Sequence, residues 1–193
     1  MEWSLGYVQP DRRSCGAAVL VVARMLNDPA YAELVLTGRH PDTGSMLAGG
    51  SVGERFGVEA LAMHRRTTGP VDVTGALQLP WPQGLGTPPW AVARQLSGSS
   101  GVPGSRYDAR VVNPFDRRSG LDAIATAAAA GHAVPLYLGS LWTPRHVVLV
   151  LDERLRTYDP SVGRRVRMDR DDFLGGTLDI AGWSRPWFAV VPV

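Results

Sequence analysis

The sequence contains no lysine, only one cysteine and no long apolar run. Its 20 basic residues are therefore all arginines, and with 18 acidic residues the formal net charge at pH 7 is +2. A single cysteine cannot form an intramolecular disulfide, which suits a reducing compartment and leaves Cys15 free for chemistry. No apolar stretch is long enough to cross a bilayer, and residues 1–10 lack the basic segment and apolar core of a secretion signal. We expect a cytoplasmic protein with no membrane partner, for which secretion by a signal-independent route remains open.

Charge and histidine spacing give no support for nucleic-acid or metal binding. The arginines are scattered, and the one dense stretch, GRRVRMDR at 163–170, is interrupted by an aspartate, contains no aromatic residue and is typical of a solvated hairpin. His40, His64 and His132 share no metal-ligand spacing with one another or with an HExxH element. We therefore expect no nucleic-acid partner, no metal and no cofactor.

The order of sequence patterns predicts an α+β fold in one domain over residues 1–193. Expected helices, mostly in the first half, cover residues 15–26, 30–37, 53–66, 89–97 and 121–130. Residues expected to face inward from the third helix are Phe56, Val58, Leu61 and Ala62. Expected strands, mostly in the second half and forming an antiparallel sheet, cover residues 106–112, 133–139, 145–151, 155–159, 163–168 and 187–193. Residues 68–89, rich in Gly and Pro, predict a long structured loop that could form the wall of a cleft.

The stretch YVQPDRRSCGAAVLVVARML carries the strongest chemical signal, because Gln9 precedes Cys15 by six residues and Cys15 begins a buried helix. A helix N-terminus directs free backbone N–H groups and the positive end of its dipole at the sulfur, which favours thiolate over thiol. The amide of Gln9, held in the preceding loop, could donate to the oxygen that becomes negative when the thiolate attacks a carbonyl. The pattern predicts acyl transfer through Cys15.

Strand spacing supplies a base and a residue to orient it. His146 begins the apolar strand RHVVLVL, and Asp159 ends the next strand, thirteen residues later. A two-residue turn at residues 152–153 would pair 146 with 159, and a slip of two residues would leave them diagonal neighbours. Either register lets the carboxylate accept the imidazole N–H, so that the other ring nitrogen can face Cys15.

Each of these residues also has a purely structural explanation. A lone cysteine is usually a small buried hydrophobe, a strand histidine is usually a core residue with satisfied hydrogen bonds, and Asp-Pro usually marks a turn. The coincidence of Gln9, Cys15, His146 and Asp159 in one arrangement favours the functional interpretation. Trp142 is an additional candidate for the substrate cleft, although an aromatic residue packed beneath a loop would explain it almost equally well.

The series Q-x5-C-G, H-V-V-x-V and D-P-x-x-G resembles papain-like cysteine peptidases. It is most similar to the bacteriocin-processing peptidases, which cut leader peptides after a double glycine and often precede an ABC transporter. The matching positions are Gln9, Cys15, Gly16, His146, Asp159, Pro160 and Gly163. The resemblance implies a papain-like fold, a triad of Cys15, His146 and Asp159, and an oxyanion hole that includes Gln9. The chain departs from the family at Ser14, where an acidic residue is common, and matches it loosely over residues 27–118.

These patterns predict a papain-like thiol hydrolase, a cysteine peptidase that acts on a peptide or protein through an acyl-enzyme on Cys15. Two alternatives stay open. An amine could capture the acyl-enzyme, or a glutamine side chain could form it, which would give a transglutaminase or deamidase, including a toxin that modifies a host protein. The chain could also be an inactive papain-like module that binds a peptide.

Overall fold

The computed structural model describes residues 6–82, 84 and 86–193. Its helices are α1 (Cys15–Asn27), α2 (Pro29–Thr37), α3 (Val52–Thr68), α4 (Pro89–Gln95), the π-helical turn η3 (Leu96–Ser100), α5 (Arg117–Ala129) and α6 (Arg170–Gly175). Its strands are β1 (Tyr107–Val111), β2 (Val134–Gly139), β3 (Pro144–Val150), β4 (Arg156–Asp159), β5 (Arg164–Arg167) and β6 (Arg185–Pro192). Most helices precede most strands, and the predicted α+β class is confirmed. Within the described ranges, no helix combines the length and apolar character that crossing a membrane requires.

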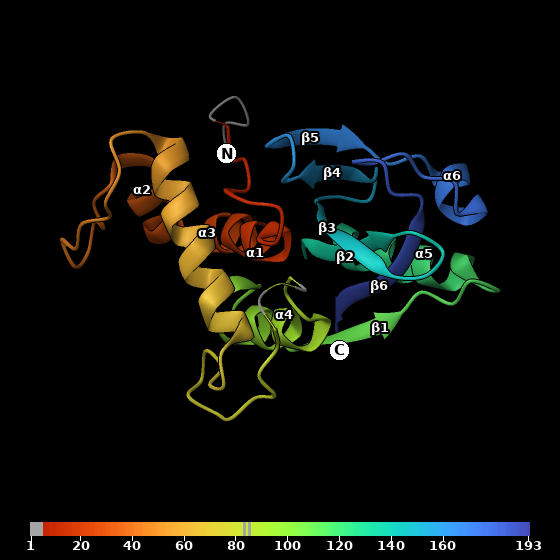
Figure 1. Ribbon diagram of the computed structural model, residues 1–193, viewed down its shortest axis with the longest axis horizontal. Coiled ribbons are helices and arrows are strands. Elements are labelled where there is room, and N and C mark those ends of the chain that lie inside the picture. Colours follow the sequence, from red (N-terminus) through yellow and green to blue (C-terminus); the bar gives the residue numbers. More distant parts are fainter. Residues whose placement is uncertain (1–5, 83, 85) are drawn as a thin grey trace.

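Helix α1 lies at the centre of the molecule. Apolar residues occupy nearly all of its faces, and ten of its thirteen residues are buried. Figure 1 shows it between α2 and α3 on one side and the sheet on the other, and it contacts both α3 and β3. The helix continues through Asn27, one residue beyond the predicted end, because the Asn27 side chain donates to the Ala23 carbonyl. A helix buried on all sides holds its first residue, Cys15, in a fixed position.

Side-chain caps fix the ends of α2 and α3. The Asp28 carboxylate accepts the Tyr31 N–H at the start of α2, and Ser51 and Glu54 form a capping box at the start of α3. The buried guanidinium of Arg55 donates to the carbonyls of Val35, Leu36 and Gly49, which joins the C-terminal part of α2 to the segment that leads into α3.

The predicted inward face of α3 is partly wrong. Phe56 is buried, but Val58 is 41% exposed and Leu61 is 36% exposed. The buried face is instead formed by Arg55, Phe56, Ala60, Met63, His64, Thr67 and Thr68. These positions follow the helical period of 3.6 residues from Phe56, and the prediction failed because two polar residues, His64 and Thr67, occupy the buried stripe.

The six strands form one antiparallel sheet in the order β1-β6-β2-β3-β4-β5. The last strand of the chain, β6, lies between β1 and β2. One core packs α1 and its neighbouring helices against residues such as Tyr137, Val147 and Leu149. The second core packs α5 and α6 against residues such as Leu136 and Val148. Because alternate residues of a strand point to opposite faces, the buried strands β2 and β3 supply both cores.

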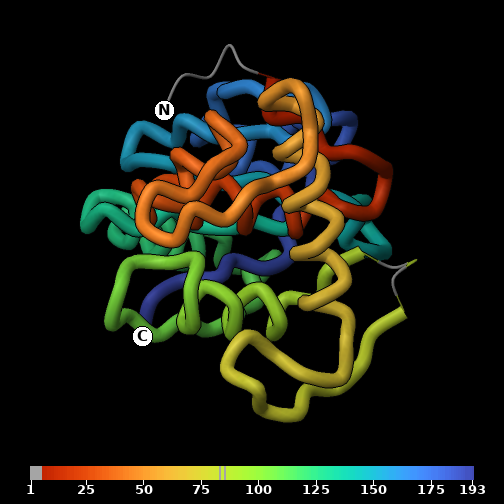
Figure 2. The backbone as a smooth tube through the Cα atoms, turned by 90° about the vertical axis from the view of Figure 1, so that its left-hand side faces the viewer, coloured from red at the N-terminus to blue at the C-terminus, as the bar shows by residue number. Residues whose placement is uncertain are grey.

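The predicted loop after α3 spans residues 69–88. An isolated bridge between Val71 and Leu77 closes its first part, which extends beyond the end of α3 in Figure 2. Gln83 and Leu85 of this loop, and residues 1–5 of the segment tested for a secretion signal, lie outside the described residues. The end of the loop returns to the start of α1.

Candidate active site at the start of helix α1

Cys15 is the first residue of α1 and is 5% exposed. The chain enters this helix through a turn held by Asp11, whose Oδ1 accepts the backbone N–H groups of Arg13 (2.8 Å) and Ser14 (2.9 Å). The Ser14 hydroxyl donates to the Asp11 carbonyl at 3.3 Å. Burial raises the pKa of Asp11, but hydrogen bonds from Arg13 and Ser14 outweigh burial, and the pKa is lowered overall. The carboxylate therefore stays ionised near the positive end of α1.

His146 lies beside a β-bulge in β3. Leu138 pairs with His146 but Gly139 pairs with Pro144, so that Arg145 is the extra residue. A Cβ atom on Gly139 would lie 2.1 Å from the Thr143 carbonyl oxygen, which only glycine avoids. A bulge changes the direction in which neighbouring side chains point, and bulges are common beside active sites.

A second irregularity faces the first across β2. Tyr137 pairs with Phe188 and Leu138 with Pro186, which makes Trp187 the extra residue of β6. The Trp187 indole N–H donates to the Ser140 carbonyl at 2.9 Å. The loop that leads to His146 is therefore fixed from both strands that flank β2.

The structure brings His146 and Asp159 into contact. The Nε2 atom of His146 lies 2.8 Å from Oδ1 of Asp159, and both side chains are buried. The same Oδ1 accepts the backbone N–H (2.9 Å) and the hydroxyl (2.8 Å) of Ser161. A carboxylate oxygen with these donors accepts the Nε2–H, which leaves Nδ1 as the nitrogen for Cys15.

The predicted two-residue turn between these strands is wrong. Leu149 pairs with Tyr158, and the Leu151 N–H donates to the Arg156 carbonyl, so the turn contains residues 152–155. The Asp152 carboxylate accepts the N–H groups of residues 154 and 156, and Leu155 adopts a φ of +58°. The register is therefore shifted by two residues from the direct pairing, and His146 reaches Asp159 diagonally.

The imidazole of His146 also contacts Cys15. Burial lowers the pKa of His146, but hydrogen bonds to Asp159 and Cys15 and the charges of both groups raise it to about 9. Burial raises the pKa of Asp159, and hydrogen bonds from His146 and Ser161 outweigh this effect and lower it. At neutral pH the arrangement favours an imidazolium between a carboxylate and the sulfur of Cys15.

Gln9 is joined to both the Cys15 loop and the sheet. Its backbone N–H donates to the Pro160 carbonyl at 2.8 Å, and its side-chain Nε2 donates to the Asp11 carbonyl at 2.8 Å. One of the two Nε2 hydrogens is used in this bond and one remains as a donor. The Oε1 atom is buried and has no hydrogen-bond partner among the described residues. The structure thus places Gln9 in the turn before Cys15.

Gly163 allows the Gln9 segment to pack against the β4–β5 turn. Its φ is +68°, and a Cβ atom there would lie 2.6 Å from Cγ2 of Val8 and 3.0 Å from the Tyr7 carbonyl carbon. The Tyr158 hydroxyl donates to the Tyr7 carbonyl from the same side. The D-P-x-x-G motif therefore has a physical role, because it holds the segment that carries Gln9 beside Asp159.

The sequence patterns did not predict the contribution of Thr87. A Cβ atom on Gly16 would lie 2.8 Å from Cβ of Thr87, so a glycine after Cys15 lets the loop approach the helix. The buried hydroxyl of Tyr137 donates to the Thr87 carbonyl at 2.8 Å. The Thr87 hydroxyl is itself buried with no hydrogen-bond partner among the described residues. Thr87 lies in a loop without hydrophobic periodicity, so no pattern places it. The only indication in the sequence is the Gly- and Pro-rich composition of residues 68–89, from which we expect a loop that could form the wall of a cleft.

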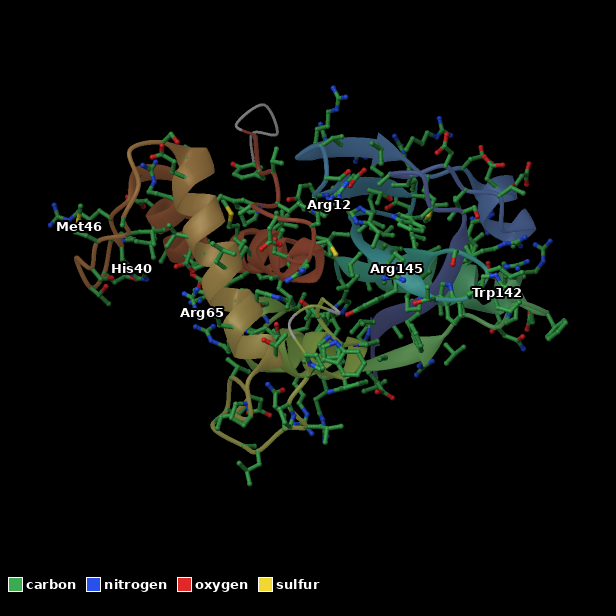
Figure 3. The ribbon with its side chains drawn as sticks, in the orientation of Figure 1. Arg12, His40, Met46, Arg65, Trp142 and Arg145 are labelled. Atoms are coloured by element: carbon green, nitrogen blue, oxygen red, sulfur yellow. The ribbon has the colours of Figure 1, made fainter. Side chains whose placement is uncertain are left out.

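Trp142 is not assembled with the other candidates. It is 82% exposed and lies in the β2–β3 loop, toward the end of the molecule opposite α2 and α3 (Figure 3). The alternative that it packs beneath a loop is therefore wrong, and its role in a substrate cleft stays a prediction. Among the residues that the structure describes, no group of three or more His, Cys, Asp or Glu side chains could hold a metal ion.

Comparisons of the chain with protein-family models, with curated proteins and with solved structures find no match. The chemistry of the site must therefore be inferred from its own geometry.

Proposed function

We propose that this protein is a papain-like thiol hydrolase that cleaves a peptide or amide bond through an acyl-enzyme on Cys15. The buried hydrogen bond between His146 and Asp159 carries the proposal, because it directs the second ring nitrogen of His146 to Cys15 at the start of α1. A cysteine that served only as a small buried hydrophobe would need neither an imidazole contact nor a carboxylate behind it.

The order of elements supports the papain-like assignment. The cysteine helix comes first and is central, and the strands that carry His146 and Asp159 follow in an antiparallel sheet. Two glycines that match the family motifs are also required by the packing. The absence of a side chain at Gly16 allows Thr87 to approach, and its absence at Gly163 allows Val8 to approach.

The reaction would proceed in two steps. The Cys15 thiolate attacks the carbonyl carbon, and the free Nε2 hydrogen of Gln9 and the backbone N–H of Cys15 stabilise the oxyanion. The imidazolium of His146 gives its proton to the leaving amine, which leaves a thioester on Cys15. His146 then removes a proton from water, and the hydroxide attacks the thioester. The acid product is released, and the thiolate–imidazolium pair of the enzyme is restored. Asp159 stays ionised and stabilises the imidazolium throughout.

The decisive experiment measures the products formed from a proteome-derived peptide library in water enriched in ¹⁸O. A hydrolase produces new peptide C-termini that contain ¹⁸O, whereas a transglutaminase produces cross-links and a deamidase converts glutamine to glutamate. We expect ¹⁸O-labelled C-termini with the native protein and none with Cys15→Ala or His146→Ala. Asp159→Ala should cause a smaller loss, because the imidazole remains.

Three outcomes would contradict the proposal. Turnover that survives Cys15→Ala would exclude the acyl-enzyme. Cross-linking or deamidation without new C-termini would replace hydrolysis by the transferase alternative. No product, combined with Cys15 alkylation no faster in the folded than in the urea-unfolded protein, would indicate a binding module without catalysis.

A further inference from the structure

The β4–β5 hairpin concentrates positive charge at one edge of the sheet. Residues 156–167, which form the hairpin, contain four of the chain's 20 arginines and one aspartate, Asp159, whose carboxylate is bonded to His146. The strand register places Arg156 directly opposite Arg167. Like charges in directly opposed positions destabilise an antiparallel pair, so packing within the hairpin does not explain this arrangement.

A cavity of about 560 Å³ lies beside the opposed pair. The turn before β4 and the segment after β5 form it, and it is lined by four arginines: Arg154, Arg156, Arg167 and Arg170. Within the described part of the chain, the ion pairs of this group join Arg156 to Asp152 and Arg170 to Asp122, and none joins a carboxylate to Arg154 or Arg167.

Two carboxylates border the cavity together with the arginines. Glu153 and Asp169 also line the cavity. The Oδ1 atom of Asp169 is occupied at the start of α6, where it accepts the backbone N–H groups of Asp171 (2.8 Å) and Asp172 (3.1 Å). Two guanidinium groups of the cavity, those of Arg154 and Arg167, thus form no ion pair with the carboxylates that the structure describes, and they can form bidentate bonds to a carboxylate of a ligand.

The backbone beside the cavity favours a peptide over a small anion. β5 is the last strand of the sheet, and its arginines, Arg164, Arg165 and Arg167, are exposed. An edge strand presents unpaired N–H and C=O groups, and an extended peptide can form backbone hydrogen bonds with them. A row of positive side chains disfavours pairing with a second copy of the same strand but accepts a strand of opposite charge.

We infer that the groove formed by β5 and this cavity binds an extended acidic peptide segment, which adds to the sheet along β5 and places carboxylates between Arg154 and Arg167. β5 begins opposite Asp159, through the pair with Arg164, and ends at the cavity about 10 Å away. Arg12, three residues before Cys15, is exposed, and in the view of Figure 3 it lies near the β4–β5 hairpin. That the segment belongs to the substrate rests on the proposed function.

Binding is measured by fluorescence anisotropy with a labelled octapeptide of alternating glutamate and threonine, using the Cys15→Ala protein so that no cleavage occurs. We expect saturable binding that weakens with salt, and no binding of the corresponding lysine peptide. The double variant Arg154→Glu/Arg167→Glu should weaken binding at least about tenfold, because both unpaired guanidinium groups are replaced by repulsive carboxylates.

A matched control separates the groove from net charge. Arg65→Glu/Arg118→Glu changes two exposed arginines elsewhere, with the same change in net charge, and should alter the affinity less than about threefold. A glutamate peptide N-methylated at alternate residues should lose binding, because it cannot complete the edge of β5. Equal losses in both double variants, unchanged binding of the N-methylated peptide, or preferred binding of polyphosphate would each overturn the inference.

The link to the substrate has a separate measurement. With the active protein, an acidic extension on a cleaved peptide should lower KM and leave kcat unchanged, and the groove variant should remove that difference. Binding without any turnover would reject the proposed function and keep the groove. Turnover that is indifferent to the extension would reject its role in substrate docking and keep the hydrolase.

Discussion

The imidazole of His146 lies between a carboxylate and a sulfur, and each of its nitrogens has a different role. Nε2 is bonded to Asp159 at 2.8 Å, which fixes the ring orientation. The second nitrogen is then available to Cys15, and the two partners together raise the pKa of His146 to about 9 although burial lowers it. Much of the candidate chemistry therefore depends on how strongly Cys15 and Asp159 stabilise the imidazolium.

We predict that Cys15→Ala lowers the pKa of His146 from about 9, because the variant removes a hydrogen bond and a charge that favour the imidazolium. Asp159→Asn should lower it as well, since burial then acts with less opposition. Histidine ¹⁵N chemical shifts recorded across the pH range measure the change, and His40, His64 and His132 serve as internal controls. An unchanged titration of His146 in Cys15→Ala would mean that the two side chains are not coupled.

Gln9 permits a second prediction at the same scale. Gln9→Ala removes the Nε2 donor, and we expect kcat to fall about 10²- to 10³-fold with little change in KM, because the donor acts on charge that develops only in the transition state. Alkylation of Cys15 by iodoacetamide forms no oxyanion and should proceed at the native rate. Parallel losses of turnover and alkylation would instead show that Gln9 positions the Cys15 loop.

At the scale of elements, α1 and the strands were predictable because continuous apolar runs and turn residues mark them. Three features were not. The turn of residues 152–155 forms because the Asp152 carboxylate accepts two backbone N–H groups. The number of residues between the two strands does not predict these hydrogen bonds. The bulge at Arg145 aims His146, yet the sequence shows only an apolar strand. The segment of Thr87 reaches Gly16 through a loop with no period. The contact between His146 and Asp159 could be anticipated because a shift of two residues keeps strand neighbours on one face.

Gly163 tests how the N-terminal segment is joined to the sheet. Gly163→Ala forces a Cβ atom to within 2.6 Å of Val8 at a φ of +68°, whereas Gly131→Ala has a φ of +87° and open space around it. We expect Gly131→Ala to lower the free energy of unfolding by about 1 kcal/mol and Gly163→Ala to lower it by about 1–3 kcal/mol more. Urea unfolding of both variants measures the difference. Equal costs would mean that the Tyr7–Val8 segment moves away freely.

The whole molecule joins a helical half to a sheet half at α1, and the candidate site lies at this junction. Residues 9–15 lead into the helix, residues 86–87 approach it from the loop after α3, and the strands contribute His146 and Asp159. Core helices pack on both faces of the sheet, but its β5 edge is uncovered by other described strands. Substrate could thus be bound by one part of the molecule and reacted upon by another.

The carboxylates that hold this junction predict the acid stability of the whole molecule. The pKa values of Asp11 and Asp159 are both lowered in the folded protein, since hydrogen bonds outweigh burial. The unfolded chain then binds protons first as the pH falls, so the stabilisation is complete above about pH 5, begins to decrease near the unfolded pKa of about 3.9 and is lost as the pH falls through the folded values. We expect the free energy of unfolding in urea to fall progressively below about pH 5. Asp159→Asn and Asp11→Asn should each be less stable than the native protein at pH 7 and should lose less free energy of unfolding over the acid range.

Asp179→Asn, which removes an exposed carboxylate, is the control and should follow the native curve. An acid limb that is equally steep in all four proteins would assign acid unfolding to general charge repulsion and not to the two carboxylates that hold the ends of the candidate site.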